Sequence, residues 1–417
     1  MKICVLGLGY IGLPTSLLFA DAGNYVIGVD INSDIIDKLK TGKLPFEEPG
    51  LEDLYSRAKS NFEVSNKVKK SDVYIIAVPT PLDKDMKIAD LSAVRAASIA
   101  ISKVINQKEM VILESTVPPG TSENIVLPIL RKNGINTMNY AYCPERAFPG
   151  KTLNEMIYND RVIGGINNKS IKIAKNLYTC FVKGNIYTTD DKTAEFIKLM
   201  ENAFRDINIA LANEFSLIAE EAKINIWEAI ELANKHPRVK ILKPGPGVGG
   251  HCIAIDPLFL AEKTSKSKIV TVAREINNYM SFHVLKLAKE MIKDIKNPTI
   301  TLLGLAYKAN IDDIRESPAL KIKKYAENEG ISVKIFDPLV KTYPQNCKSL
   351  DISLKNSDCL VLVTDHEVFK EINPKNIKMK HKNLLDTRNM LDHEKWLKSG
   401  FNVKIIGNGV ERNKLKV

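Results

Sequence analysis

A single cysteine, Cys252, ends a segment that is rich in glycine and proline, Pro244-Gly245-Pro246-Gly247-Val248-Gly249-Gly250-His251-Cys252. Such a segment is unsuited to the interior of a helix or a strand. Its glycines allow positive φ angles and a close approach of the backbone to a ligand, and its amide N–H groups favour a thiolate over a thiol. We therefore predict that Cys252 is a nucleophile, whereas an isolated cysteine elsewhere is more often a small buried apolar residue.

A second set of polar residues follows a helical spacing. Lys198, Asn202 and Arg205 are separated by four and three residues, so they share one face of a helix. A cation and an amide that point into a cleft would stabilise a developing oxyanion, although such stripes are more often solvated. Asp256, four residues after Cys252, could orient a water molecule or a lysine.

The N-terminus carries a dinucleotide-binding pattern. Gly7-Leu8-Gly9-Tyr10-Ile11-Gly12 follows an apolar run at residues 2–7 and precedes a helical pattern that reaches Ala22, and Asp30 ends the next apolar run. The glycines permit a tight turn and close contact with a pyrophosphate, and an acidic residue at this distance hydrogen-bonds the ribose. Because a carboxylate repels a 2′-phosphate, the sequence predicts NAD rather than NADP.

Three further turns follow predicted strands: Val78-Pro79-Thr80-Pro81, the segment from Glu114 to Thr121 that contains Thr116, and the segment from Cys143 to Gly150 that contains Glu145 and Arg146. Ligands bind at the carboxyl ends of parallel strands, so we expect the first two turns to flank the nicotinamide side, with ordinary proline turns as the alternative. The third turn adds a carboxylate at the same edge. Glu145 could position a water molecule or accept a proton, and a solvated loop glutamate is the alternative.

Apolar runs and helical patterns alternate in both halves of the chain, which predicts an α/β protein with two doubly wound Rossmann-like domains joined by a central helical region. We expect a cofactor domain at residues 1–185, a helical region with long helices at 193–223 and 257–293 within 186–296, and a second α/β domain at 297–417. Long helices with apolar residues on more than one side predict a homodimer or a higher oligomer.

Composition excludes several classes of protein. The chain has 417 residues, a formal charge of +11 and six scattered cysteines without a C-x-x-C pair, so neither a metal site nor a disulfide framework is expected. No aromatic and basic module predicts nucleic-acid binding. No apolar run is long enough to span a membrane and no signal-peptide pattern is present, so we expect no membrane insertion and a cytoplasmic location.

Five motifs occur in the order found in the UDP-glucose/GDP-mannose dehydrogenase family, which the chain resembles over about residues 2–390. They are Gly7 to Gly12, Glu114 to Thr121, Glu195 to Glu214, Gly245 to Asp256 and Lys308 to Ser317. The resemblance implies that Cys252 forms a thiohemiacetal and then a thioester during two successive oxidations by NAD. It implies that Lys198 and Asn202 stabilise the oxyanion, and that Glu145, Thr116 and Asp256 handle water and protons.

The resemblance also assigns binding residues. Cofactor contacts beyond the glycine motif are expected at Pro79, Thr80, Thr116 and Arg315. Substrate contacts are expected at Glu145, Arg146, Lys198, Asn202, Arg205, Gly249, Lys308 and Arg388, and Arg238 is expected to reach the substrate of a neighbouring subunit.

Residues 139–146, 201–206, 236–238 and 249–257 are most similar to the subgroup that oxidises UDP-N-acetyl-D-mannosamine at C6 to the uronate, a precursor of surface polysaccharides. Ala254-Ile255-Asp256 replaces the Pro-Lys-Asp typical of members that act on UDP-glucose. Alternatives are oxidation of UDP-GlcNAc or UDP-GalNAc, a two-electron dehydrogenase with a structural Cys252, and a non-catalytic sensor of nucleotide sugars.

Overall fold

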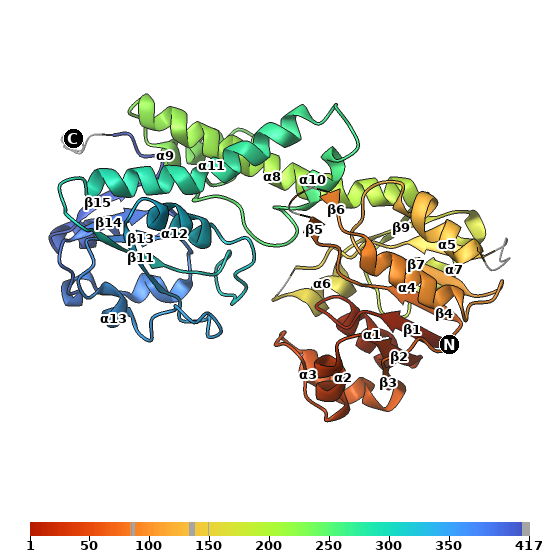
Figure 1. The fold of residues 1–417 in the computed structure, drawn as a ribbon. Coiled ribbons are helices and arrows are strands. Elements are labelled where there is room, and N and C mark those ends of the chain that lie inside the picture. Colours follow the sequence, from red (N-terminus) through yellow and green to blue (C-terminus); the bar gives the residue numbers. More distant parts are fainter. Residues whose placement is uncertain (84, 86–87, 133–137, 149, 411–417) are drawn as a thin grey trace. The chain divides into compact units, whose positions relative to one another are not determined.

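The computed structural model describes residues 1–83, 85, 88–132, 138–148 and 150–410, so Pro149 and residues 411–417 of the predicted segments lie outside it. The chain divides into two compact units, Met1–Glu201 and Asn202–Val417 (Figure 1). The boundary falls inside one long helix, so both units contain part of the central region that the sequence predicts. The three-domain boundaries themselves stay a prediction.

The first unit contains an eight-stranded sheet in the order β10-β9-β8-β7-β4-β1-β2-β3. Its strands are β1 (Lys2–Leu6), β2 (Tyr25–Val29), β3 (Phe62–Ser65), β4 (Val73–Ile76), β7 (Met110–Leu113), β8 (Asn139–Tyr142), β9 (Arg161–Gly165) and β10 (Ile186–Thr189). The short strands β5 (Leu82–Asp83) and β6 (Ile88–Ala89) form a separate hairpin. β1 lies between β2 and β4, so the glycine motif leaves the sheet next to the turn that follows β4.

One pair of strands departs from the parallel sheet expected for residues 1–185. β8 and β9 are antiparallel, with Tyr142 opposite Gly164, whereas β9 and β10 are parallel. Because β9 runs opposite to β8, it begins at the carboxyl edge of the sheet, where β8 ends. Arg161, its first residue, therefore lies beside the predicted edge turns.

Helices cover both faces of this sheet because alternate residues of its strands are apolar and buried. Ile3 and Val5 face α1 (Gly12–Asp21), α2 (Ser33–Lys40), α3 (Leu51–Ala58), α6 (Thr152–Tyr158) and α7 (Asn168–Tyr178). Cys4 and Leu6 face α4 (Ser92–Ser102), the π-helical turn η2 (Ser122–Val126) and α5 (Leu127–Arg131). A short 3₁₀ turn, η1 (Lys59–Asn61), precedes β3.

The long helix α8 (Asp191–Glu221) confirms the helix expected at 193–223, and α9 (Ile226–Ala233) begins after Asn225, whose side chain accepts a hydrogen bond from the Trp227 N–H. The second long helix is shorter than expected. It is divided into α10 (Asp256–Ala261) and α11 (Lys268–Met291). The Thr264 hydroxyl between them accepts the Lys266 N–H at 3.1 Å, a local bond that competes with helix formation.

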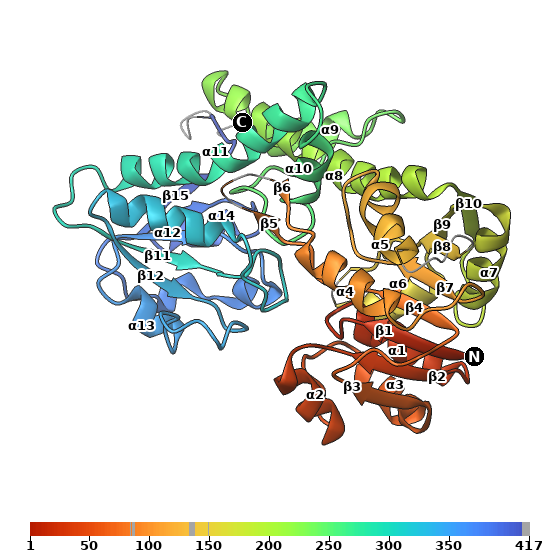
Figure 2. The same cartoon turned by 45° about the vertical axis from the view of Figure 1, so that its right-hand side comes forward.

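The second unit contains a five-stranded parallel sheet in the order β12-β11-β13-β14-β15. The strands are β11 (Thr299–Leu303), β12 (Ser332–Phe336), β13 (Cys359–Leu362), β14 (Asn383–Asp386) and β15 (Asn402–Ile405). α11 and α12 (Pro318–Asn328) cover one face (Figure 2), and α13 (Leu350–Leu354), η3 (Glu367–Glu371) and α14 (His393–Lys398) cover the other. The short turn η4 (Pro374–Asn376) contacts α14. The α/β prediction is thus confirmed in both halves. None of the helices that the structure describes is long and apolar enough to cross a membrane.

Candidate active site

The glycine motif forms a tight turn between β1 and α1. Gly7 has φ +94°, and a Cβ there would lie 2.4 Å from the Ala77 carbonyl oxygen; a Cβ on Gly12 would lie 1.9 Å from the Gly7 carbonyl oxygen. Gly9 differs, since a Cβ there meets no atom within 4 Å. The turn is therefore closed by two glycines and open at the third, the feature expected of a cradle for phosphates.

Asp30 fixes this turn from the end of β2. One carboxylate oxygen accepts the Leu8 N–H at 2.8 Å and the other accepts the Asn32 N–H at 2.8 Å. Tyr10 and Ile11 differ in environment, because Tyr10 is 44% exposed against Phe46 and Ile11 packs on the core. The carboxylate thus holds the backbone of the motif, and its contact with a ribose stays a prediction.

The turns after β4 and β7 lie side by side, as expected for neighbouring parallel strands. The buried Thr80 hydroxyl donates to the Thr116 carbonyl oxygen at 2.7 Å, and the Ser115 hydroxyl donates to that of Val78 at 2.7 Å. Pro79 is exposed and Thr116 is half-buried at this edge. Two predicted cofactor turns are therefore brought together within the first unit.

A buried carboxylate joins the turn after β7 to the first turns of α8. Glu195 accepts the Gly120 N–H at 2.5 Å, and it accepts the Ser122 N–H and hydroxyl at 2.7 Å each. Burial raises the pKa of Glu195 to about 7, against the effect of these hydrogen bonds. Lys198 is half-buried and follows Glu195 by about one turn of α8. The contacts of Glu195 therefore fix the position of Lys198 relative to the loop after β7.

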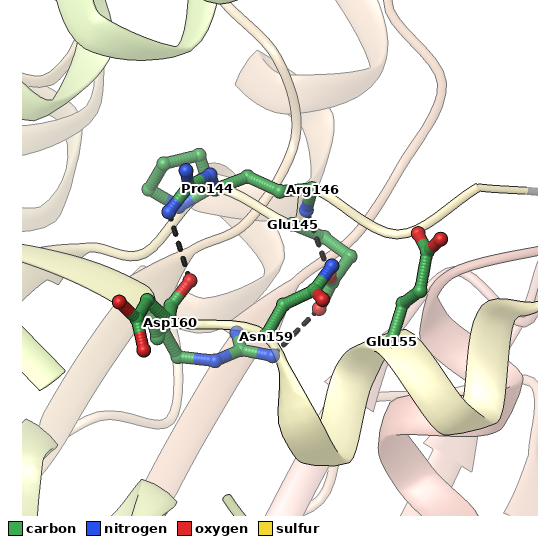
Figure 3. Close-up of a pocket in the computed structure, with 7 residues that line it drawn as sticks. Pro144, Glu145, Arg146, Glu155, Asn159 and Asp160 are labelled. Atoms are coloured by element: carbon green, nitrogen blue, oxygen red, sulfur yellow. Dashed lines mark hydrogen bonds and ion pairs between the residues drawn. The ribbon is translucent and has the colours of Figure 1, made fainter. Parts of the chain in front are cut away.

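Glu145 is buried and fully engaged rather than solvated. One oxygen accepts the N–H groups of Arg146 at 2.6 Å and Ala147 at 2.8 Å, and the other lies 2.6 Å from the Arg161 guanidinium. Glu145, Arg146 and Arg161 are among the residues that line a cavity of about 10 Å³, which has room for about one water molecule (Figure 3). The carboxylate is therefore held in one orientation beside a small polar cavity.

The same network continues beneath the edge turns. The Glu114 carboxylate accepts the Tyr178 hydroxyl at 2.5 Å and the Thr15 hydroxyl at 3.1 Å, and it lies 3.9 Å from the Arg161 guanidinium. Burial raises the pKa of Glu114 to about 7, while Arg161 opposes that shift. This charged cluster ties α1, β7, β9 and α7 together below the carboxyl edge of the sheet.

Arg146, predicted to contact substrate, holds the edge turn against α8. Its guanidinium forms a two-pronged ion pair with Glu201 at 2.7 and 3.0 Å. It also donates to the Asp160 carbonyl oxygen at 2.8 Å (Figure 3). These contacts give Arg146 a structural role in the first unit. A contact with substrate stays a prediction.

The cysteine loop of the second unit is anchored at several points. The Gly245 N–H donates to the Asn213 side chain at 2.8 Å, and the Ser281 hydroxyl donates to the Pro246 carbonyl oxygen at 2.8 Å. The Gly250 N–H donates to the Arg315 carbonyl oxygen at 2.9 Å. A Cβ on Gly249 or Gly250 would lie less than 3.0 Å from Tyr307, so only glycine allows the loop to pack this closely.

Three of the predicted catalytic residues meet in the second unit. The Asn202 amide donates to the buried Asp256 carboxylate at 2.5 Å, and the Asp256 N–H donates to the Cys252 carbonyl oxygen at 2.8 Å. Cys252 is exposed and has an electrostatic contact with Arg315. The Cys252 backbone is therefore tied to Asp256 and through it to Asn202, and the exposed thiol has its electrostatic contact with Arg315.

The remaining predicted cations lie in different surroundings. Arg315 forms a fork with Asp313, with an Nη2 to Oδ2 distance of 2.6 Å, and Arg388 pairs with Asp365 at 3.0 Å. A Cβ on Gly245 would lie 2.6 Å from Arg388, so this guanidinium adjoins the cysteine loop. Lys308 is half-buried, and Arg205 and Arg238 are exposed.

Within the described residues, no group of acidic, histidine or cysteine side chains could hold a metal ion.

Comparison with known proteins decides the family. Three domain profiles of the UDP-glucose/GDP-mannose dehydrogenase family match: the NAD binding domain at residues 1–182, the central domain at 192–279 and the UDP binding domain at 301–393. The chain belongs to this family. It is accordingly an NAD-dependent nucleotide-sugar dehydrogenase, and its second α/β domain binds the UDP moiety.

Individual relatives span nearly the whole chain. The UDP-N-acetyl-D-mannosamine dehydrogenase of Methanococcus vannielii is 46% identical over 98% of this chain and 97% of its own. An NDP-N-acetyl-D-galactosaminuronic acid dehydrogenase of Ralstonia nicotianae is 40% identical over 93% of this chain and 96% of its own. The solved UDP-D-ManNAc dehydrogenase of Pyrococcus horikoshii superposes with a TM-score of 0.93 at 41% identity, covering 98% of this chain and 100% of that one.

Sequence reasoning gave no role to several buried titratable side chains of this family member: Arg161, Tyr178, Glu195, Asp337 and His366. The available signal was weak but present. Arg161 begins an apolar strand, and His366 follows another at its carboxyl end. A charged residue at the end of a buried strand is a candidate for pairing at the sheet edge, because unpaired burial is costly.

Proposed function

We propose that this dehydrogenase oxidises the C6 hydroxymethyl group of UDP-N-acetyl-D-mannosamine to a carboxylate, using Cys252 as a covalent nucleophile. Support comes from the relatives of that name, which match over almost the full chain, and from Ala254 and Ile255 in place of the Pro-Lys pair typical of glucose-specific members. The removal of four electrons requires two equivalents of NAD.

The first unit has the features needed to hold the cofactor. Gly7 and Gly12 close the turn and Gly9 leaves open space in front of the N-terminus of α1, which suits a pyrophosphate. When bound, NAD supplies the hydride acceptor. Thr80 and Thr116 would flank the nicotinamide side, and Asp30 would face the ribose.

The proposed reaction passes through two intermediates that are bound covalently to the sulfur of Cys252. The C6 alcohol first loses a hydride and a proton and becomes an aldehyde. The Cys252 thiolate then adds to the aldehyde carbon, and protonation gives a thiohemiacetal. Loss of a second hydride and the hydroxyl proton gives a thioester, and water cleaves the C–S bond to release the uronate and regenerate the thiol. The reactive aldehyde is never released.

The observation that carries this proposal is the contact of Asn202 and Asp256 beside the Cys252 loop. In the proposed mechanism, Asn202 and Lys198 donate to the oxygen that develops negative charge, and Asp256 fixes the amide in the donor orientation. Glu145, paired with Arg161, and Thr116 would order the hydrolytic water. Arg315, Lys308 and Arg388 would hold the phosphates of the two nucleotides, and Arg238 would reach a partner's substrate.

NADH stoichiometry tests the mechanism directly. The wild-type chain should release two NADH per UDP-N-acetyl-D-mannosamine, and Cys252→Ser should lose the second oxidation. One NADH per sugar in the wild type, together with a near-normal rate in Cys252→Ser, would favour a two-electron enzyme with a structural cysteine. The exposed Cys180→Ser variant is the matched control.

A galactosamine or glucosamine nucleotide is the second candidate substrate. The Ralstonia relative, named for N-acetyl-D-galactosaminuronic acid, is only slightly less similar than the mannosamine relatives. Initial rates with UDP-ManNAc, UDP-GlcNAc and UDP-GalNAc at equal concentrations separate the three. A kcat/KM that is highest for UDP-GlcNAc or UDP-GalNAc would replace the proposed sugar and leave the cysteine mechanism intact.

We further propose a homodimer, because α8 carries exposed apolar side chains at helical spacing. Phe204, Leu211 and Ile218 follow each other at seven-residue intervals and are 70%, 38% and 55% exposed. Such a stripe is typical of a helix that packs on a partner helix.

A cytoplasmic location is proposed because NAD and nucleotide sugars are available there. The uronate product would serve glycosyl transfer into surface polysaccharides.

A further inference from the structure

A fully buried histidine at the carboxyl edge of the second sheet has both ring nitrogens engaged. His366 Nδ1 accepts the backbone N–H of Asn310 at 2.9 Å, and His366 Nε2 lies 2.9 Å from an oxygen of Asp337. Because a backbone N–H can only donate, Nδ1 carries no proton in this arrangement. The contact with Asp337 is therefore made by the Nε2 proton, which is donated to the carboxylate.

Asp337 is a fixed anion that orients the ring. Its side chain is buried, and the oxygen that accepts from His366 also accepts the N–H groups of Leu305 at 2.7 Å and Ala306 at 2.9 Å. Burial raises the pKa of Asp337, but the hydrogen bonds from His366 and Ala306 outweigh it and lower the pKa to about 2. The carboxylate thus holds the imidazole in one tautomer and one orientation.

The segment that donates a hydrogen bond to His366, residues 308–310, contains a residue with a positive φ angle. Asn310 has φ +61°, a conformation that asparagine tolerates and β-branched residues do not. Its side-chain oxygen accepts the Glu367 N–H at 3.1 Å, so residues 310 and 366–367 exchange two hydrogen bonds. Lys308 is two residues away in the same segment.

This segment also adjoins the cysteine loop. Residues 304–317 connect β11 to α12, and within them the Tyr307 ring packs against Gly250. The Gly250 N–H donates to the Arg315 carbonyl oxygen near the end of the same connection. The connection is thus tied at one point to the loop that carries Cys252 and at another to His366.

We propose that His366 is a positioning residue for nucleotide-sugar binding, which holds residues 308–310 so that Lys308 meets the substrate. The inference rests on the proposed function, in which Lys308 holds the nucleotide sugar. Without this hydrogen bond the segment populates other conformations, and the apparent affinity falls by the fraction of molecules that remain competent. Loss of one hydrogen bond of this kind corresponds to roughly a tenfold change in KM.

Two substitutions separate the two contacts of the ring. In His366→Asn the amide oxygen replaces Nδ1 as acceptor for the Asn310 N–H, whereas in His366→Gln the amide nitrogen replaces Nε2 as donor to Asp337. We expect His366→Gln to raise the KM for UDP-N-acetyl-D-mannosamine about tenfold, with kcat and the KM for NAD nearly unchanged. His366→Asn should restore the KM to near the wild-type value. An equal rise in both variants means a merely structural role and overturns the proposal, as does no rise in either.

Substitution of the exposed Asn310 tests the same contact without disturbing the buried pair. Asn310→Gly keeps the N–H and the positive φ and should behave like wild type, whereas Asn310→Val, which cannot adopt that φ, should raise the KM about tenfold. An unchanged KM in Asn310→Val overturns the proposal. His381→Gln removes another histidine and aspartate pair, with Asp358 at the amino edge of the same sheet, and serves as the matched control.

A double-mutant cycle shows whether the effect passes through Lys308. If it does, His366→Gln raises the KM no further in a Lys308→Met background. Independent, multiplicative effects would contradict this coupling. A wild-type chain that does not oxidise the nucleotide sugar would instead reject the proposed function, so the two failures are distinguishable.

Discussion

The Asn202 amide donates a hydrogen bond to the Asp256 carboxylate at 2.5 Å, and Asp256 in turn donates its N–H to the Cys252 carbonyl oxygen at 2.8 Å. The two side chains are 54 residues apart in sequence. Since a carboxylate accepts only, the amide nitrogen must face Asp256. The orientation of Asn202, on which a role toward an oxyanion depends, is thus set by a residue of the cysteine loop.

Asn202→Ala should lower kcat by roughly 10²-fold to 10³-fold, because it removes a preorganised donor at the site of developing charge. The KM values should change much less, since the donor acts chiefly in the transition state. Initial rates of NADH formation with UDP-N-acetyl-D-mannosamine measure this effect. Asn208→Ala, six residues further along α8, is the control, because this half-buried amide donates to the Phe204 carbonyl oxygen of its own helix in the described contacts. A similar loss in both variants would contradict a catalytic role for Asn202.

Gly9→Ala should weaken NAD binding without unfolding the protein. A Cβ at Gly9 meets no protein atom within 4 Å, so the space it would fill is the space expected for the pyrophosphate. The KM for NAD should rise roughly tenfold or more, as expected for the loss of a close backbone contact worth at least about 1.4 kcal/mol. Steady-state kinetics and the thermal shift produced by NAD measure it.

Gly12→Ala provides the contrast, because its Cβ would lie 1.9 Å from the Gly7 carbonyl oxygen. That variant should lose thermal stability even without cofactor. If Gly9→Ala and Gly12→Ala melt alike and bind NAD alike, the distinction between an open and a closed position of the motif is wrong.

The parts of the fold that were predictable depend on local patterns. The apolar strands, the glycine motif and the long helix α8 follow from periodicity and turn chemistry, which are readable in sequence. The antiparallel β9 and the break before α11 were not predicted, because one depends on where the chain re-enters the sheet and the other on a local hydroxyl contact.

The candidate site was predictable in its residue types and less so in their partners. Cys252, Asn202 and Asp256 were expected together and do meet within one unit. Glu145 was expected as a candidate to position water or accept a proton, yet its partner Arg161 begins a strand whose direction was not foreseen. Which buried charges pair is set by tertiary contacts between distant segments, and no short spacing in the sequence encodes it.

Glu195 should make stability decrease as the pH rises from about 4.5 to 7. Burial raises its folded-state pKa to about 7, above the ordinary value of 4.5, so the folded state retains a proton that the unfolded chain has released. The contribution is fully present below about pH 4.5 and is lost as the pH passes through 7. It amounts to at most about 3 kcal/mol.

Glu195→Gln cannot titrate at this position, so its melting temperature should fall less between pH 5 and pH 8 than that of wild type. Melting curves at several pH values measure the difference. The exposed Glu123→Gln variant, near the same turn, should keep the wild-type dependence. Identical pH profiles for wild type and Glu195→Gln would show that the carboxylate is already ionised at low pH.

Charge on the apolar stripe of α8 should dissociate the proposed homodimer. Phe204, Leu211 and Ile218 are exposed in the single chain, and burial of such side chains against a partner stabilises by about 25 cal/mol per Å² of apolar area. Phe204→Glu combined with Leu211→Glu places unpaired charges in that surface, at a cost of several kcal/mol. Light scattering after size exclusion should therefore report the mass of one 46.6 kDa chain instead of two.

Tyr158→Glu, which charges an exposed aromatic residue on α6, is the matched control and should leave the mass unchanged. If the double variant keeps the wild-type mass, this face of α8 is not the interface.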